Sequence, residues 1–164
     1  YLQCPFIFFA CDTLVLEDIP ELNENWIGVS SVTDSLPYLV SEVTDHQVER
    51  FHDKIELDQL QQLSSNTQSV LDHAFIGLAA VKDHEAFWQG LEEAPELIRN
   101  ERQVSGGLNA LIPKGLVTVP FTWFDLGTDE LYEQAIQQIT GSRALIKPDE
   151  FTYIEGENVI KFFA

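Results

Sequence analysis

Two aspartates that each follow an apolar stretch are the residues of this sequence best placed for chemistry. Asp12 comes after the apolar residues 5–10, and Asp125 comes after the extended residues 116–121. Ligands of open α/β sheets collect outside the carboxyl ends of the strands, so we expect both carboxylates at one edge of a sheet. Carboxylate oxygens suit Mg²⁺, which binds few protein ligands and completes its shell with substrate phosphates. The pattern therefore predicts a magnesium site formed by Asp12 and Asp125.

Each of these aspartates also has a purely structural interpretation. Asp12 could accept hydrogen bonds from the turn after its strand, and Asp125 could interact favourably with the N-terminal dipole of a helix that begins just after it. We favour the joint site because both residues end apolar strands and both precede a Thr or a Gly-containing turn.

Two further positions could bind a substrate. Asp53 and Lys54 follow the predicted strand 47–51, and such a pair offers a mobile positive charge for a phosphate beside a carboxylate for sugar hydroxyls. Solvated surface is the alternative for this pair. Gly77 lies inside an otherwise bulky apolar strand, which indicates a β-bulge or the close approach of a ligand, with plain packing as the alternative.

The elements that would position these residues follow from the apolar spacing. Strands are predicted at residues 5–10, 26–32, 36–41, 47–51, 73–81 and 116–121, with hairpins turning at 44–46 and 155–157. Apolar residues at three- and four-residue spacing predict helices at 84–94 and 128–139. A further helix is expected at 106–112, ended by residues 113–115, and residues 58–69 are expected to be a surface connection or short helix. We therefore expect an α/β fold with a Rossmann-like, mostly parallel mixed sheet flanked by helices, and with antiparallel hairpin additions.

Composition excludes several classes of protein. The chain has 9 Lys and Arg against 27 Asp and Glu, a formal charge of -18, so it lacks the basic surface that nucleic acid requires. No apolar stretch has the length of a membrane span. The two cysteines, which we expect in the core, fit a reduced cytoplasmic protein better than a disulfide scaffold. Zinc spacings, a serine-nucleophile elbow and a P-loop are also missing from the sequence.

Three motifs resemble the sugar-phosphate nucleotidyltransferases, the nucleotide-sugar pyrophosphorylase-like family. Residues 8–13 resemble its strand ending in an aspartate motif, residues 52–54 resemble its Glu-Lys-Pro motif, and residues 123–128 resemble its Trp-x-Asp-x-Gly-Thr motif. Cys11, Asp53 and Ile55 stand where the family has Gly, Glu and Pro. The family's Gly-rich nucleotide loop would precede Tyr1, and the sequence opens directly on an apolar strand. We therefore expect an N-terminally truncated piece, because a buried chain end must be tied down.

The resemblance implies the domain organisation and the reaction. Residues 1–147 would form the larger, C-terminal part of a nucleotidyltransferase domain, and residues 148–164 would be a hairpin tail that leads to further sequence. The intact enzyme would join a nucleoside triphosphate to a sugar 1-phosphate and release pyrophosphate, with Asp12, Asp125 and Lys54 as catalytic residues. Asp53, Lys54 and Gly77 would bind the substrate, Asp12 and Asp125 would hold Mg²⁺, and this piece alone would turn over poorly. Polysaccharide biosynthesis in the cytoplasm is the expected setting, and a homo-oligomer is compatible with the sequence.

Two alternatives remain open at this point. The altered motif at residues 53–55 and the missing loop are compatible with a non-catalytic α/β binding or assembly module. A nucleotide-sugar-dependent glycosyltransferase also uses aspartates and a metal, and its product would be a free nucleoside diphosphate instead of pyrophosphate.

Overall fold

A computed structural model describes residues 2–94, 97–98, 101–140, 152–155 and 158–161 of the chain. The chain forms two compact units, Tyr1–Trp123 and Phe124–Ala164, and each is described by itself. The first unit contains a six-stranded sheet among the described residues. Its strand order is β1 (Phe6–Phe9), β6 (Ala74–Val81), β3 (Trp26–Ser30), β9 (Val117–Pro120), β5 (Gln47–Asp53) and β4 (Leu39–Thr44). All six predicted strands are thus present, although β4 begins and ends three residues later than the predicted strand 36–41.

The mixed α/β fold is confirmed, but the prediction of a mostly parallel sheet was wrong. Among the described strands, β3 and β9 form a parallel pair, and the other neighbouring strands of the six-stranded sheet run antiparallel. An apolar run indicates that a strand is buried but contains no signal for its direction. Here β5 returns through two short helices, α1 (Leu57–Leu63) and α2 (Thr67–Leu71), into β6, which lies antiparallel between β1 and β3.

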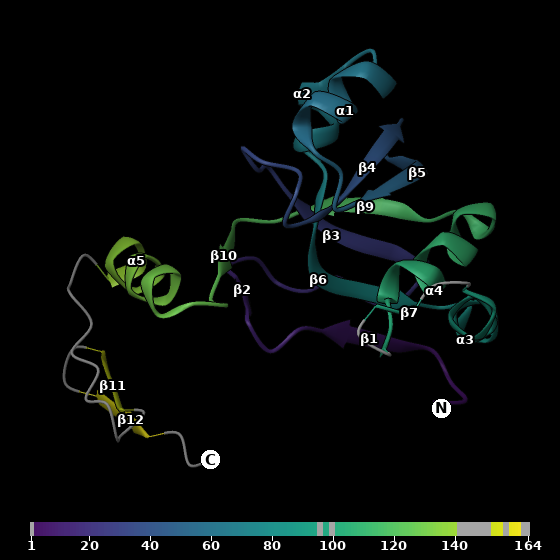
Figure 1. The fold of residues 1–164 in the computed structure, drawn as a ribbon. Helices are drawn as coiled ribbons and strands as arrows, with labels where there is room; N and C mark the ends of the chain where they lie inside the picture. Colours follow the sequence, from purple (N-terminus) through teal and green to yellow (C-terminus); the bar gives the residue numbers. More distant parts are fainter. Residues whose placement is uncertain (1, 95–96, 99–100, 141–151, 156–157, 162–164) are drawn as a thin grey trace. The chain divides into compact units, whose positions relative to one another are not determined.

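Strand direction still brings several chain segments to one edge of the sheet. Because β6 is antiparallel to both β1 and β3, the strands β1, β3 and β9 run in the same direction (Figure 1). A further pairing joins β4, the last strand of this order, back to β6, because Val40 at the start of β4 pairs with Ala74 at the start of β6. Leu39 pairs with Asp53, so the end of β5 also lies at the start of β6. The start of β6 is at the same edge as the end of β3, since these two strands are antiparallel. The ends of β1, β3, β9 and β5 therefore lie at one edge, which we call the strand-end rim.

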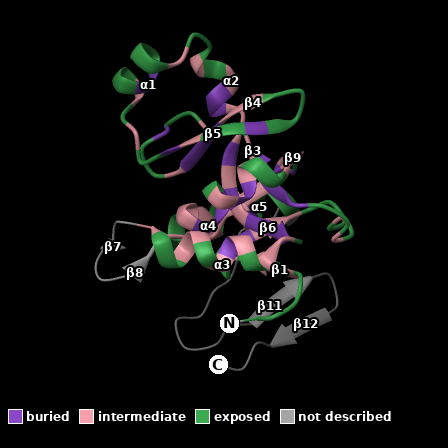
Figure 2. Cartoon of the chain, turned by 90° about the vertical axis from the view of Figure 1, so that its right-hand side faces the viewer, coloured by how far each residue is buried: buried purple, intermediate pink, exposed green. Residues whose placement is uncertain are grey.

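Two helices cover one face of the sheet. They are α3 (His84–Glu93) and α4 (Val104–Leu111), the latter followed by the 3-10 turn η1 (Ile112–Lys114). Both helices lie within two residues of their predicted positions. Glycines allow their close contact, since a Cβ on Gly107 would come within 2.5 Å of the Phe87 ring. The buried cluster beneath these helices joins Ile27, Val29, Ala79 and Val81 of the sheet to Phe87, Leu108 and Leu111. Figure 2 draws buried residues in purple, and they include stretches of β3 and β6.

The first strand, which its apolar run indicated to be buried, is only partly buried. Strand β1 is the terminal strand of the described sheet, and its side chains Ile7 and Phe9 are 43% and 46% exposed. Phe6 faces the other side, where its ring stacks on Trp88 of α3 at a centroid distance of 5.3 Å. Both cysteines are exposed, so their prediction as core residues was wrong.

The second unit contains helix α5 (Asp129–Thr140) and the antiparallel hairpin of β11 (Thr152–Glu155) and β12 (Asn158–Lys161). The predicted cap of the helix is present, because the Leu131 N–H donates to the hydroxyl oxygen of Thr128 at 3.3 Å. The predicted boundary between residues 147 and 148 lies outside the described residues. In the described ranges, no helix is both long enough and apolar enough to cross a membrane.

Candidate functional site

Asp12 lies on a tight turn at the strand-end rim. The turn follows β1 and leads into the short strand β2 (Thr13–Val15), which the sequence did not predict. The Ala10 N–H donates to the carbonyl of Gly77 at 2.8 Å, and the Thr13 hydroxyl donates to the carbonyl of Ile76 at 2.6 Å. The turn is thus held against β6 on both sides of Asp12, whose side chain is exposed.

Gly77 allows this turn to lie so close to the sheet. Its φ is +80°, and a Cβ on it would lie 2.7 Å from the Cβ of Ala10. The register between β3 and β6 shifts at this point, from Ile27 opposite Ala79 to Val29 opposite Phe75. A β-bulge was one of the predicted reasons for a glycine here, and the pairing of β3 with β6 is irregular at this position. Its predicted role in substrate binding stays a prediction.

Lys54 and Asp53 lie where β5 ends, and the backbone of Lys54 is unusual. Its φ is +50°, in the left-handed region that a lysine seldom adopts. Its N–H donates to the Tyr38 carbonyl at 3.3 Å, and the Asp53 carboxylate accepts from the Ser105 hydroxyl at 3.1 Å. Backbone outliers of this kind cluster at binding and catalytic sites, so Lys54 is a candidate site residue on geometry as well as on sequence.

Aromatic contacts link the Lys54 segment to the end of β9. The rings of Tyr38 and Trp123 meet edge to face with centroids 5.6 Å apart. Trp123 packs against the buried cluster that contains Ile76 and Phe121, and Val15 of β2 packs against the same cluster. The first unit thus brings the Asp12 turn, Gly77, Trp123 and the Lys54 backbone to one rim.

The indole N–H of Trp123 is buried and has no hydrogen-bond partner in the described part of the chain. An unmet donor of this kind costs about 1–3 kcal/mol. Native proteins keep few such groups, and those they keep call for an explanation such as a functional role. The motif at residues 123–128 pointed to this tryptophan only as a marker for Asp125, and no sequence signal indicated Tyr38 or Ser105.

Asp125 lies in the second unit, at the end of β10 (Trp123–Asp125), a strand that crosses the boundary between the units. One carboxylate oxygen accepts the Gly127 N–H at 2.9 Å, which is the turn interaction weighed for this residue from the sequence. Because Asp12 and Asp125 belong to different units, their joint site stays a prediction.

Glu17 anchors the segment after β2 to the end of β9, a role that the sequence did not indicate. Both of its carboxylate oxygens lie 2.9 Å from the Thr122 backbone nitrogen, which donates to them. Leu16 donates to the Thr122 carbonyl at 3.3 Å beside it. Hydrogen bonding by Thr122, from its side chain first and also from its backbone, lowers the pKa of Glu17 below its ordinary value of 4.5.

This lowered pKa predicts a pH dependence of stability. A carboxylate whose pKa is lower in the folded state stabilises the fold above its unfolded pKa of about 4.5, and the effect is lost as the pH falls through the folded value. We expect the melting temperature of the wild type to exceed that of Glu17→Gln above pH 4.5, and the difference to vanish in more acidic buffer. Glu24→Gln removes the same charge without the bond to Thr122, and an identical profile for both variants would contradict the anchor.

The two candidate carboxylates suit a hard cation, although they form no complete cage. Within the described ranges, no group of three or more His, Cys, Asp or Glu side chains is arranged to hold a metal ion. Magnesium commonly takes one or two carboxylates and completes its shell with water and substrate phosphates. The chemistry of each carboxylate, Asp12 and Asp125, therefore fits a magnesium ion whose other ligands are water and phosphate.

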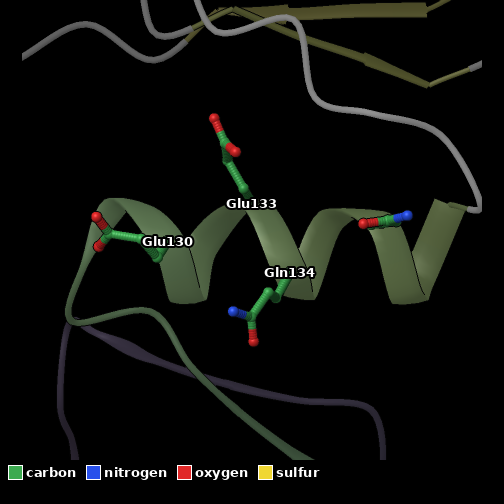
Figure 3. Close-up of a pocket in the computed structure, with 4 residues that line it drawn as sticks. Glu130, Glu133 and Gln134 are labelled. Atoms are coloured by element: carbon green, nitrogen blue, oxygen red, sulfur yellow. The ribbon is translucent and has the colours of Figure 1, made fainter.

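Two hollows are lined by residues other than the candidate site residues. One runs along α5 and is lined, in the described part, by Glu130, Glu133, Gln134 and Gln137; the three that Figure 3 labels point away from the helix in different directions. Its glutamates would repel a phosphate. The other hollow lies at the end of β6 and the start of α3, and its lining mixes both charges: Lys82, Asp83, His84, Glu85, Ala86 and Lys114.

Comparison with known proteins adds the fold family. No family model and no curated protein matches the sequence. Among solved structures, the chain is similar to a Bacillus anthracis protein described as a glucose-1-phosphate thymidylyltransferase, solved with sucrose (TM-score 0.61, 15% identity, 88% of this chain and 58% of that one). It is also similar to apo UDP-glucose pyrophosphorylase (TM-score 0.60, 16% identity, 84% and 54%). The fold is that of the sugar-phosphate nucleotidyltransferases.

A third nucleotidyltransferase fold, UTP-bound UGPase from Acinetobacter baumannii, matches with a TM-score of 0.55 and 14% identity over 83% of this chain and 50% of that one. The chain therefore spans between 50% and 58% of the length of these nucleotidyltransferases. The resemblance drawn from residues 8–13, 52–54 and 123–128 is confirmed at the level of the fold.

Proposed function

We propose that this chain is the sugar-phosphate-binding part of a magnesium-dependent nucleotidyltransferase that makes a nucleotide sugar and pyrophosphate. The observation that carries the proposal is the left-handed Lys54 at the rim where the end of β1 also presents Asp12. A lysine in a costly backbone conformation and an exposed carboxylate at the same rim suit a phosphate that binds together with a cation. The nucleotidyltransferase fold of the chain supports the same reaction class.

Each site residue has a role in this reaction. An oxygen of the sugar 1-phosphate attacks the α-phosphorus of a nucleoside triphosphate, and the bond to pyrophosphate breaks, so no protein nucleophile is needed. Lys54 would steady the sugar phosphate, and Asp53 and Gly77 would be further substrate-binding positions. Asp12 and Asp125 would hold a magnesium ion, which neutralises charge on the phosphoryl oxygens when bound. The protein supplies positioning and electrostatics.

The strongly acidic chain makes the cation and the lysine necessary. A formal charge of -18 repels phosphorylated substrates, so binding needs local positive charge at the rim. The 164 residues contain no Gly-rich phosphate loop, and we propose that this chain alone turns over poorly. Sucrose and UTP in the related structures support a sugar phosphate and a nucleotide as partners. Nucleotide-sugar supply for polysaccharide synthesis in the cytoplasm is the proposed setting.

Calorimetric titration of this chain with glucose 1-phosphate tests the proposal. We expect glucose 1-phosphate to bind in the presence of Mg²⁺ and this binding to be lost when Mg²⁺ is chelated. The cation offsets the repulsion between the negatively charged sugar phosphate and the acidic chain. Lys54→Ala is expected to weaken binding about tenfold or more, the value of a charge-assisted contact. Lys114→Ala removes an exposed lysine from the other edge of the sheet and serves as the control. Equal binding by both variants would remove Lys54 from the site.

A non-catalytic α/β module is the second candidate function. The Asp53 carboxylate accepts from Ser105, and Ile55 follows Lys54 where the family has a proline. Both features are compatible with a motif kept for structure after the chemistry was lost. Absence of any magnesium-dependent binding of sugar phosphate or nucleotide would favour this candidate.

A further inference from the structure

His52 forms a buried hydrogen bond two residues before Lys54. The residue is 9% exposed, and its Nε2 lies 2.7 Å from the Oε1 of Glu42 on the neighbouring strand. A carboxylate only accepts, so Nε2 carries the proton and donates it. In the register of β4 and β5, His52 pairs with Val40 and Glu42 pairs with Arg50, so the histidine and the glutamate are diagonal neighbours on one face.

Three consecutive residues at the end of β5 are bonded to three different parts of the fold. His52 donates to Glu42 of β4, Asp53 accepts from Ser105 of α4, and the Lys54 N–H donates to the carbonyl of Tyr38. His52 and Asp53 point to opposite faces of the strand, because successive side chains of a strand alternate. The strand end is therefore fixed on both faces immediately before Lys54.

This fixation explains why Lys54 keeps a costly backbone conformation. Among the described residues, the other non-glycine positions with positive φ are Asp45 and His46, at 49° and 67°. Those two form the hairpin turn between β4 and β5, where paired left-handed residues are the usual geometry. Lys54 lies in no hairpin turn, so its conformation depends on the surrounding contacts.

We propose that His52 is a positioning residue for Lys54: its hydrogen bond to Glu42 holds the end of β5 so that Lys54 stays left-handed and directs its ammonium group to the substrate phosphate. The binding part of this inference rests on the proposed function. The structural part concerns only the coupling between the His52–Glu42 bond and the Lys54 backbone.

A thermodynamic cycle without ligand tests the coupling. Lys54→Gly removes the left-handed strain, and we expect it to raise the melting temperature of the wild type by about 2 °C. In the Glu42→Ala background, where His52 has lost its acceptor, the same change is expected to give no rise, because the backbone has already relaxed. Glu42→Gln keeps an acceptor oxygen and is expected to restore the rise. His46→Gly, at a positive φ in the hairpin, is expected to raise the melting temperature equally in all backgrounds.

An equal effect of Lys54→Gly in every background would overturn the coupling. Since Arg50 lies opposite Glu42, His52→Leu is the second disrupting variant, and it must give the same result as Glu42→Ala. A folded His52→Leu chain in which Lys54→Gly still stabilises would also overturn the proposal.

Titration with glucose 1-phosphate and Mg²⁺ then tests the positioning role. We expect Glu42→Ala to weaken binding about tenfold, and Glu42→Gln to bind as the wild type does. The loss is expected to disappear in a Lys54→Ala background, because His52 acts through Lys54. A loss of the same size with and without Lys54 would overturn the positioning role. A wild type that shows the ligand-free coupling and binds no sugar phosphate would contradict the proposed function and leave the coupling established.

Discussion

An Asp12→Asn chain is expected to bind Mg²⁺ in the presence of glucose 1-phosphate at least about 100-fold more weakly than the wild type, beyond the 10- to 100-fold typical of residues outside the first coordination shell. Asparagine keeps the size and hydrogen-bonding capacity of the side chain but removes the charge that a hard divalent cation requires. The turn around Asp12 is held through Ala10 and Thr13, so the substitution should leave the fold intact.

Asp125→Asn extends this experiment across the two units. If both carboxylates bind one ion, the double variant should bind magnesium about as weakly as either single variant, because the first substitution already abolishes the shared site. Additive losses would show that the aspartates act separately. Asp45→Asn changes an exposed aspartate at the hairpin turn between β4 and β5, and it should bind magnesium like the wild type. Unchanged magnesium binding in Asp12→Asn would remove this residue from the site.

The described elements show which parts of the fold were visible in the sequence. The apolar run at residues 73–81 became β6 because its side chains are buried on both faces, and the stripe that includes Phe87 became α3. The sequence could not show that β6 would lie antiparallel between β1 and β3, because strand direction depends on which partners meet in space. The prediction of a mostly parallel sheet was therefore wrong. The strands β1, β3 and β9 still run in one direction, so their ends lie together at the strand-end rim.

The candidate site was predictable as residue types and much less as geometry. Asp12 and Lys54 were proposed because each follows a predicted strand, and the structure places both of them shortly after strands. The left-handed backbone of Lys54 had no sequence signal, since positive φ is expected of Gly, Asn or Asp and is set here by tertiary contacts. The hydrogen bonds of His52 and Ser105 could not be predicted for the same reason: each residue is bonded to a partner on another element.

Gly77→Ala is expected to destabilise the first unit by about 2–5 kcal/mol, the largest stability effect we predict. Two costs add at this position. Alanine must adopt a φ of +80°, and its Cβ would lie 2.7 Å from the Cβ of Ala10. The left-handed backbone accounts for about 1–2 kcal/mol, and the overlap for about 1–3 kcal/mol. Urea denaturation followed by tryptophan fluorescence would measure the change, since Trp26 lies in the buried cluster that contains Ile76.

Gly115→Ala separates the two costs. Gly115 has a φ of +84°, and a Cβ on it would meet no atom within 4 Å, so its substitution carries the backbone cost alone, about 1–2 kcal/mol. The excess loss in Gly77→Ala then measures how tightly the turn that carries Asp12 is pressed onto β6. If the turn moves away from β6 to make room for the new Cβ, the stability loss should equal that of Gly115→Ala. Magnesium binding should then weaken, because Asp12 moves with the turn. Equal losses with unchanged magnesium binding would mean that neither Gly77 nor the turn above it positions the site.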